Sequence, residues 1–99
     1  MQIAKVRGTV VSTYKDPSLR GTKFLFLQYL DDAGEPLPKY EVAADIVGAG
    51  INEWVLVSRG SAARQVGESD KRPIDAMVVG IIDTVSVDNS MLYRKKDQY

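Results

Sequence analysis

The segment VGAGINEWVLVSRGSAAR, residues 47–64, contains the signals that decide the fold. Gly48 and Gly50 resemble the start of a phosphate-binding loop, but a dinucleotide fingerprint needs a third glycine and a helix that meets the pyrophosphate. Here the strand-forming run WVLV follows instead, and the Glu53 carboxylate would repel a phosphate. The glycines are therefore predicted to form a tight turn between two strands, where glycine adopts a positive φ at low cost.

The rest of the chain is mostly strand-like, because apolar, β-branched and aromatic residues recur in short runs between turn residues. In the first run, AKVRGTVVST, the alternation predicts that Ala4, Val6, Gly8 and Val10 share one face. Gly8 and Gly80 are candidate bulge or bend positions of the kind that a small barrel needs to close. Strands are predicted over residues 4–13, 23–30, 40–47, 53–58 and 76–87.

Segments outside these runs are predicted to be loops, with one short exception. Residues 31–40 contain Gly34, Pro36 and Pro38 and are predicted to form a hairpin loop. The sequence SAARQ, from Ser61, is predicted to form about one turn of helix capped by the Ser61 hydroxyl.

Five strands with one short helix between the fourth and fifth predict an all-β fold, a small closed barrel of the oligonucleotide-binding (OB) type. The chain of 99 residues is expected to hold one domain over residues 1–89, followed by a C-terminal tail over residues 90–99. Within the tail, RKKD at residues 94–97 is expected to be solvated, or else to contact a neighbouring subunit or shell protein.

Composition restricts the function classes. The chain has 13 basic and 13 acidic residues, no cysteine and no histidine. These absences exclude a disulfide framework and a thiolate zinc site, and they remove the commonest general base and transition-metal ligand. We expect no catalytic residue, cofactor or metal. The charged start MQIAKVRG and the short apolar runs predict a cytoplasmic protein with neither a signal peptide nor a membrane span.

Barrels of this type often bind single-stranded nucleic acid, which requires basic residues and exposed aromatic rings along one groove. Here the basic residues are scattered and the net charge is zero. The aromatic residues Phe24, Phe26, Tyr29 and Trp54 lie within aliphatic strands and are predicted to be core or interface residues. Nucleic-acid binding is therefore the disfavoured alternative.

The second, fourth and fifth predicted strands are apolar on both faces, whereas a single barrel needs only its inner face to be apolar. Either a second subunit covers the apolar surface on the outer faces of these strands, or the loops at residues 13–22 and 60–75 cover it. We expect another subunit.

Three motifs stand in order along the chain: AKVRGTVVST, GAGINEWVLVSRGSAAR and RPIDAMVVGIIDTV. With them the sequence resembles the EutN/CcmL family of bacterial microcompartment vertex proteins, with its carboxysome branch the most similar. The resemblance implies a barrel that assembles into a homopentameric ring at the vertices of a polyhedral shell, with hexameric shell proteins as facet partners. The shell would enclose ribulose-bisphosphate carboxylase and support CO2 concentration; a vertex in a different, metabolosome-type compartment is the alternative.

Within this motif, several residues are expected to shape turns or subunit contacts. Glu53 and Arg64 are expected to pair within or between subunits, or to remain solvated. The small residues are expected to let neighbouring backbones approach, or to form an ordinary surface turn. The turn glycines are Gly48, Gly50 and Gly60, and the small residues are Ser61, Ala62 and Ala63.

Overall fold

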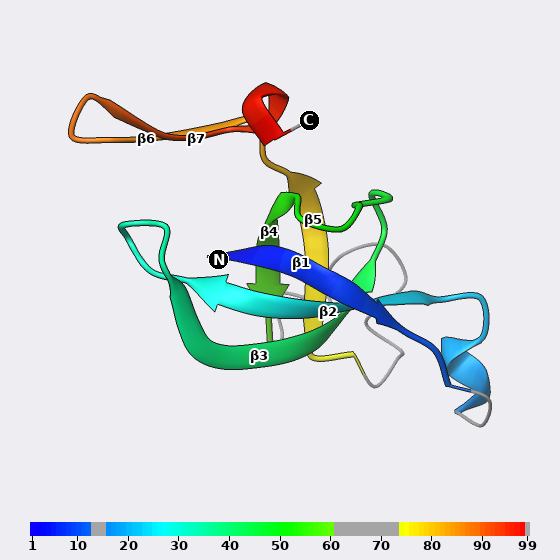
Figure 1. Ribbon diagram of the computed structural model, residues 1–99. Helices are drawn as coiled ribbons and strands as arrows, with labels where there is room; N and C mark the ends of the chain where they lie inside the picture. The colour runs from blue at the N-terminus through cyan, green and yellow to red at the C-terminus, as the bar shows by residue number, and fades with distance from the viewer. Residues whose placement is uncertain (13–15, 61–73, 99) are drawn as a thin grey trace.

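The computed structural model describes residues 1–12, 16–60 and 74–98. The predicted helix from Ser61 and the site residues Ser61, Ala62, Ala63 and Arg64 lie outside these ranges. The elements, in chain order, are β1 (Gln2–Val10), the 3-10 turn η1 (Pro17–Leu19), β2 (Lys23–Leu30), β3 (Pro36–Asp45), β4 (Trp54–Arg59), β5 (Ala76–Ile81), β6 (Thr84–Val87), β7 (Ser90–Arg94) and the 3-10 turn η3 (Lys95–Gln98) (Figure 1).

The first five strands form a closed barrel in the order β1-β2-β3-β5-β4, as the sequence predicts. Neighbouring strands are antiparallel except β3 and β5, which are parallel. Small and branched side chains fill the interior, as expected for a barrel with few strands. The core residues include Ala4, Val6, Leu25, Leu27, Tyr29, Val55, Val57 and Val78, each no more than 2% exposed.

A bulge in β1 changes which side chains face outward. Val6 pairs with Leu27, but the next paired residue is Gly8, opposite Phe26. Because Leu27 is buried and Phe26 is 39% exposed, Gly8 lies on the outer face, and the prediction that it shares a face with Val6 is wrong. A second bulge precedes Gly80, since Leu56 pairs with Gly80 while Val57 pairs with Val78. Both glycines therefore adjoin bulges, as predicted.

The predicted hairpin loop over residues 31–40 is too long, because β3 begins at Pro36. Proline lacks a backbone N–H and is tolerated only where no ladder bond is needed. One side of β3 pairs with β2, and the other side pairs with β5 only at Ala44 and Asp45. Pro36 and Pro38 therefore lie in a part of β3 where the β5 side has no strand partner.

The predicted fifth strand is in fact two strands belonging to different sheets. β5 ends at Ile81, and β6 pairs with β7 in a separate two-stranded hairpin that projects from the barrel (Figure 1). Asp88 and Asn89, with φ of 51° and 63°, form its turn, which suits a two-residue hairpin connection. The predicted boundary at residue 89 falls inside this turn, and the segment expected to be a C-terminal tail contains β7 and η3.

The hairpin is anchored to the barrel at its base. The ring of Tyr93 stacks on that of Trp54, with centroids 4.2 Å apart and an interplanar angle of 14°. Tyr93 is 4% exposed, so this contact buries the ring almost completely. The Lys95 amide then donates to the Asp83 carbonyl oxygen at 2.8 Å, which brings the two ends of the hairpin together.

Candidate assembly surface

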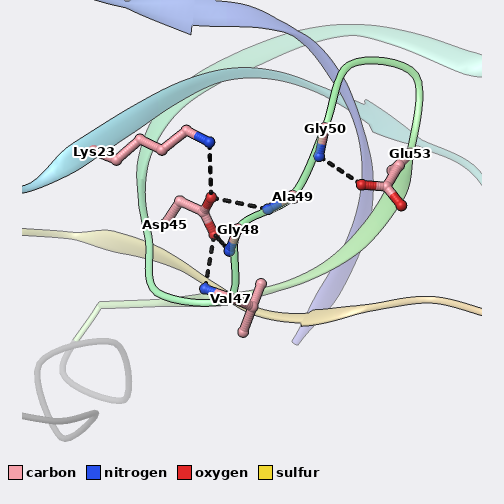
Figure 2. Close-up of polar contacts among 7 residues, drawn as sticks. All are labelled: Lys23, Asp45, Val47, Gly48, Ala49, Gly50 and Glu53. Atoms are coloured by element: carbon pink, nitrogen blue, oxygen red, sulfur yellow. Dashed lines mark hydrogen bonds and ion pairs between the residues drawn. The ribbon is translucent and has the colours of Figure 1, made fainter.

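The loop between β3 and β4 is organised by the carboxylate of Asp45. This carboxylate accepts backbone hydrogen bonds from Val47 (3.0 Å), Gly48 (3.1 Å) and Ala49 (3.0 Å) (Figure 2). The ammonium of Lys23 lies 3.7 Å from it. A single buried side chain therefore satisfies three consecutive loop amides, because hydrogen bonds to an ionised acceptor are strong and replace those that water would make.

This arrangement answers the phosphate question raised by the two glycines. Consecutive backbone amides that point into one concavity are what an anion site requires. Here those amides already donate to Asp45, whose negative charge would also repel a phosphate. The loop is a structural turn.

Two residues of this turn have left-handed backbone conformations. Gly48 has φ 78°, as predicted, and Asn52 has φ 72°. Asparagine tolerates this region better than most side chains do. Gly50 is outside the positive-φ region, so that part of the prediction is wrong. A Cβ there would lie 3.2 Å from Glu53 Oε1, and glycine therefore provides space for the carboxylate.

Glu53 is held at the end of the loop and is only 7% exposed. Its carboxylate accepts a hydrogen bond from the Gly50 amide at 2.5 Å and lies 3.0 Å from the Lys95 ammonium (Figure 2 shows the first contact). Arg64, the partner considered from sequence, is outside the described residues. The sequence did not predict the roles of Asp45 and Lys95. Its pattern indicates only that Asp45 lies in a strand, and no residue near Lys95 in the sequence indicates that it pairs with Glu53.

The outer surface of β2 and β3 carries an uncovered apolar patch. Phe26 pairs with Val42 across the two strands, and Tyr40 lies on the same face. The rings of Phe26 and Tyr40 stack, with centroids 5.5 Å apart and planes 5° from parallel. Phe26, Tyr40 and Val42 are 39%, 54% and 47% exposed. We call these three residues the outer β2–β3 face.

A groove of about 420 Å³ lies between the barrel and the base of the projecting hairpin. Ile3 and Leu56 pair across β1 and β4 on its floor, and Val85 of β6 contributes from the hairpin. Gly80 pairs with Leu56, and a Cβ there would lie 3.4 Å from Leu56 Cδ1. The lining, which we call the hairpin-base groove, comprises Ile3, Leu56, Ile81, Ile82, Asp83, Thr84 and Val85.

A part-buried polar cluster joins β2, β3 and β4. The Tyr29 hydroxyl donates to Glu41 Oε1 at 2.6 Å, and Arg59 Nε lies 2.7 Å from the same oxygen. Burial, reinforced by the hydrogen bond to Glu41, raises the pKa of Tyr29 well above its usual value. A phenol that keeps its proton and whose acceptor is already paired is a structural group and a poor general base.

The described residues contain no group of three or more acidic, histidine or cysteine side chains that could hold a metal ion. None of their helices is long and apolar enough to cross a bilayer.

Comparison with known proteins gives this architecture a context. The family described as ethanolamine utilisation protein EutN/carboxysome matches residues 1–83. The carboxysome shell vertex protein CcmL of Gloeobacter violaceus is 73% identical over 99 residues, which span 100% of this chain and 99% of that protein. The solved structure of Gloeobacter violaceus CcmL has a TM-score of 0.94 at 72% identity and covers 98% of this chain and 100% of that chain.

A second solved structure, the GrpN pentameric microcompartment shell protein from Rhodospirillum rubrum, has a TM-score of 0.80 at 50% identity and covers 88% of this chain and 99% of that chain. The closed barrel is thus shared with proteins of microcompartment shells. The chain belongs to the EutN/CcmL family, which includes vertex proteins of carboxysome shells.

Proposed function

We propose that this chain forms homopentameric vertices of a carboxysome shell. The observation that carries the proposal is that one small barrel presents two unlike apolar surfaces, the outer β2–β3 face and the hairpin-base groove. A cyclic ring repeats one interface between two different patches until the rotation closes. A relative with the same barrel is titled a pentameric microcompartment shell protein, which supports fivefold closure.

The role is geometric and not catalytic. A flat layer of hexagonal units cannot close into a polyhedron, and fivefold units supply the corners that it lacks. We propose that the rings join hexameric shell proteins at these corners in the shell, and that the closed shell keeps CO2 close to ribulose-bisphosphate carboxylase. The high identity to a carboxysome shell vertex protein supports this assignment of the compartment.

The first experiment is native mass spectrometry of the purified chain at micromolar concentration. A homopentamer is expected. A monomer under these conditions would overturn the proposal, because a vertex requires a closed ring.

A second experiment tests the vertex role in cells. Deleting the gene in a host that makes carboxysomes should leave cargo and facets but yield elongated or open bodies and a higher CO2 requirement. Restoring this chain should restore polyhedra, and normal polyhedra in the deletion strain would contradict the vertex role.

A vertex in another kind of microcompartment is the second candidate, since GrpN shares half of the aligned residues. Expression in strains lacking either a carboxysome vertex protein or a metabolosome vertex protein separates the two. Rescue of the carboxysome strain alone is expected, and rescue of only the metabolosome strain would reassign the compartment.

A further inference from the structure

We infer that the projecting β6–β7 hairpin docks an acidic segment of a partner protein, in a cavity between the outer face of the hairpin and the η3 turn. The partner places carboxylates against Arg94 and Lys96 and an aliphatic side chain against Met91. This inference goes beyond the vertex role and does not depend on how many copies form the ring.

The hairpin presents two different faces. Val85 and Tyr93 are directly opposed across the strands, and the ring of Tyr93 stacks on Trp54, so this pair faces the barrel. Successive side chains of a strand point to opposite faces. Thr84 and Arg94, the neighbouring opposed pair, therefore lie on the outer face.

A cavity of about 570 Å³ lies on this outer face, at the base of the hairpin. The η3 turn follows β7 directly and coils beside the base, so that its lysines form one wall (Figure 1). The Ser86 hydroxyl lies 3.8 Å from Met91 Sδ across the strands, which places the thioether on the same face. The lining comprises Asp83, Thr84, Met91, Arg94, Lys95 and Lys96.

The cavity is built on a fixed base. The Lys95 ammonium lies 3.0 Å from the Glu53 carboxylate of the barrel, and the Lys95 amide donates to the Asp83 carbonyl oxygen at 2.8 Å. These contacts hold η3 beside the hairpin. A site that is already shaped before binding loses less conformational entropy when a partner docks.

The charge of the lining determines the chemistry of the partner. Three of the six lining residues are cationic, and one, Asp83, is acidic. Arg94 Nε lies 3.7 Å from an Asp97 carboxylate oxygen, with the two side chains 38% and 63% exposed. Such an exposed ion pair contributes little, so a partner carboxylate can replace Asp97 at the guanidinium. A guanidinium binds a carboxylate through two parallel hydrogen bonds, and the exposed Lys96 adds a second cation.

The exposure of the lining favours a protein segment over a small molecule. A small ligand is normally enclosed, so that most of its surface is buried. Here Met91 is 49% exposed, and Thr84 and Lys96 are exposed as well. Methionine adapts its shape to different apolar partners. Met91 can therefore accept an aliphatic side chain that lies beside a carboxylate in an extended acidic segment.

The hairpin also lies outside the part of the chain that the family match covers. That match ends at residue 83, and β6 begins at Thr84. The alignment with CcmL of Gloeobacter violaceus extends over 99 residues and so includes the hairpin. A contact made by the hairpin can therefore differ between relatives that share the barrel.

The test titrates the full chain with a fluorescein-labelled peptide of alternating glutamate and valine residues. Carbon-13 labels on the methyl groups of the three methionines report where the peptide binds. The Met91 resonance should shift, whereas those of Met1 and of Met77, which is 2% exposed, should not. Added salt should weaken the binding, because the contact is between charges. A peptide of alternating lysine and valine should leave Met91 unchanged.

Paired substitutions then locate the charge that binds the peptide. Arg94→Gln combined with Lys96→Gln should weaken the peptide's affinity by about tenfold or more, because two charge-assisted contacts are lost. Arg20→Gln combined with Lys39→Gln is the matched control, since both residues are exposed, lie outside the lining and carry the same charge. This control should bind like the wild type, and native mass spectrometry should show the same oligomer for all three chains.

Two kinds of result would overturn the inference. The first is a Met91 resonance that does not move at millimolar peptide, or equal weakening by the two double variants. The second is a shift of Met91 by acetate or inorganic phosphate as large as that caused by the peptide at the same concentration, which would make the cavity a site for small anions.

The remaining outcomes separate this inference from the proposed ring. If the cavity double variant changes the oligomer, Met91→Glu replaces it, and peptide anisotropy equal to that of the wild type would count against docking. A pentamer that does not bind the peptide overturns this inference alone. A monomer that binds it overturns only the proposed ring.

Discussion

The carboxylate of Glu53 lies 3.0 Å from the ammonium of Lys95, and this ion pair joins the loop before β4 to the last turn of the chain. The same carboxylate accepts the Gly50 amide, so one side chain fixes both the glycine turn and the base of the projecting hairpin.

Replacing Lys95 should therefore weaken the fold. Lys95→Met removes the cation beside a carboxylate that is only 7% exposed, and we expect the free energy of unfolding to fall by about 1–2 kcal/mol. Urea unfolding at one fixed protein concentration measures it. Lys96→Met, at an exposed position of the same turn, should change stability by no more than about 0.5 kcal/mol. Equal effects of the two substitutions would contradict the importance of the ion pair.

Removing the Asp45 carboxylate should cost more. Asp45→Ala leaves three loop amides without their acceptor, and the amide of Ala49 belongs to a residue that is only 2% exposed. We expect a loss of about 2–3 kcal/mol in the free energy of unfolding. The control is Asp31→Ala, whose carboxylate accepts two amides in an exposed loop and should cost about 1 kcal/mol or less. A smaller loss for Asp45→Ala than for Asp31→Ala would disprove the argument from burial.

Backbone conformation should dominate at Asn52. Its φ of 72° strains most side chains that have a Cβ, and Asn52→Ala should destabilise the chain by about 1 kcal/mol. Asn52→Gly adopts the same conformation freely and should remain within about 0.5 kcal/mol of the wild type. Thermal unfolding of the wild type, Asn52→Ala and Asn52→Gly is the measurement. If the amide side chain of Asn52 were what stabilises the turn, both substitutions would lower the stability equally.

The free energy of unfolding should fall at alkaline pH because of Tyr29. Its folded-state pKa is raised, so above pH ~10 the unfolded chain loses this proton while the folded chain retains it. The contribution of this proton to the free energy of unfolding is fully present below that pH. It is lost as pH rises further, with a slope of up to about 1.4 kcal/mol per pH unit for one proton. Tyr29→Phe should be less stable than wild type at pH 8 by about 1 kcal/mol, because it lacks the hydrogen bond to Glu41.

That deficit should shrink between pH 10 and 11.5, because phenylalanine has no proton to lose. Urea unfolding across this range is the measurement. A constant difference between the two chains would mean that Tyr29 ionises equally in both states.

The sequence predicts the barrel well but not everything attached to it. The strand over residues 23–30 matches β2 at both ends, because its apolar run is bounded by turn residues and its period is clear. The break after Ile81 was not predicted, because strand-forming residues continue on both sides of Asp83 while the pairing partner changes from a barrel strand to β7. Periodicity reports which face a side chain occupies, and it carries no information about which strand lies alongside.

The assembly residues were predicted less well. The surplus apolar surface was recognised from the two-sided strands, but the bulge at Arg7, which brings Gly8 beside Phe26, shifts the faces of β1. The proposed contacts of Ser61, Ala62, Ala63 and Arg64 with a neighbouring subunit remain predictions. The contacts of Asp45 with the loop amides and of Lys95 with Glu53 exist only once the loop has folded and the C-terminal segment has returned to the barrel.

The filled interior of the barrel has a consequence for permeability. Tyr29, Leu25, Leu27 and the buried valines of β1, β4 and β5 occupy its centre. Bicarbonate therefore has no route along the axis of a single barrel, and in the proposed ring a conduit would have to run between copies. Its width would then be set by how closely five copies approach one another, so a substitution that loosens their contact would also make the corner leak.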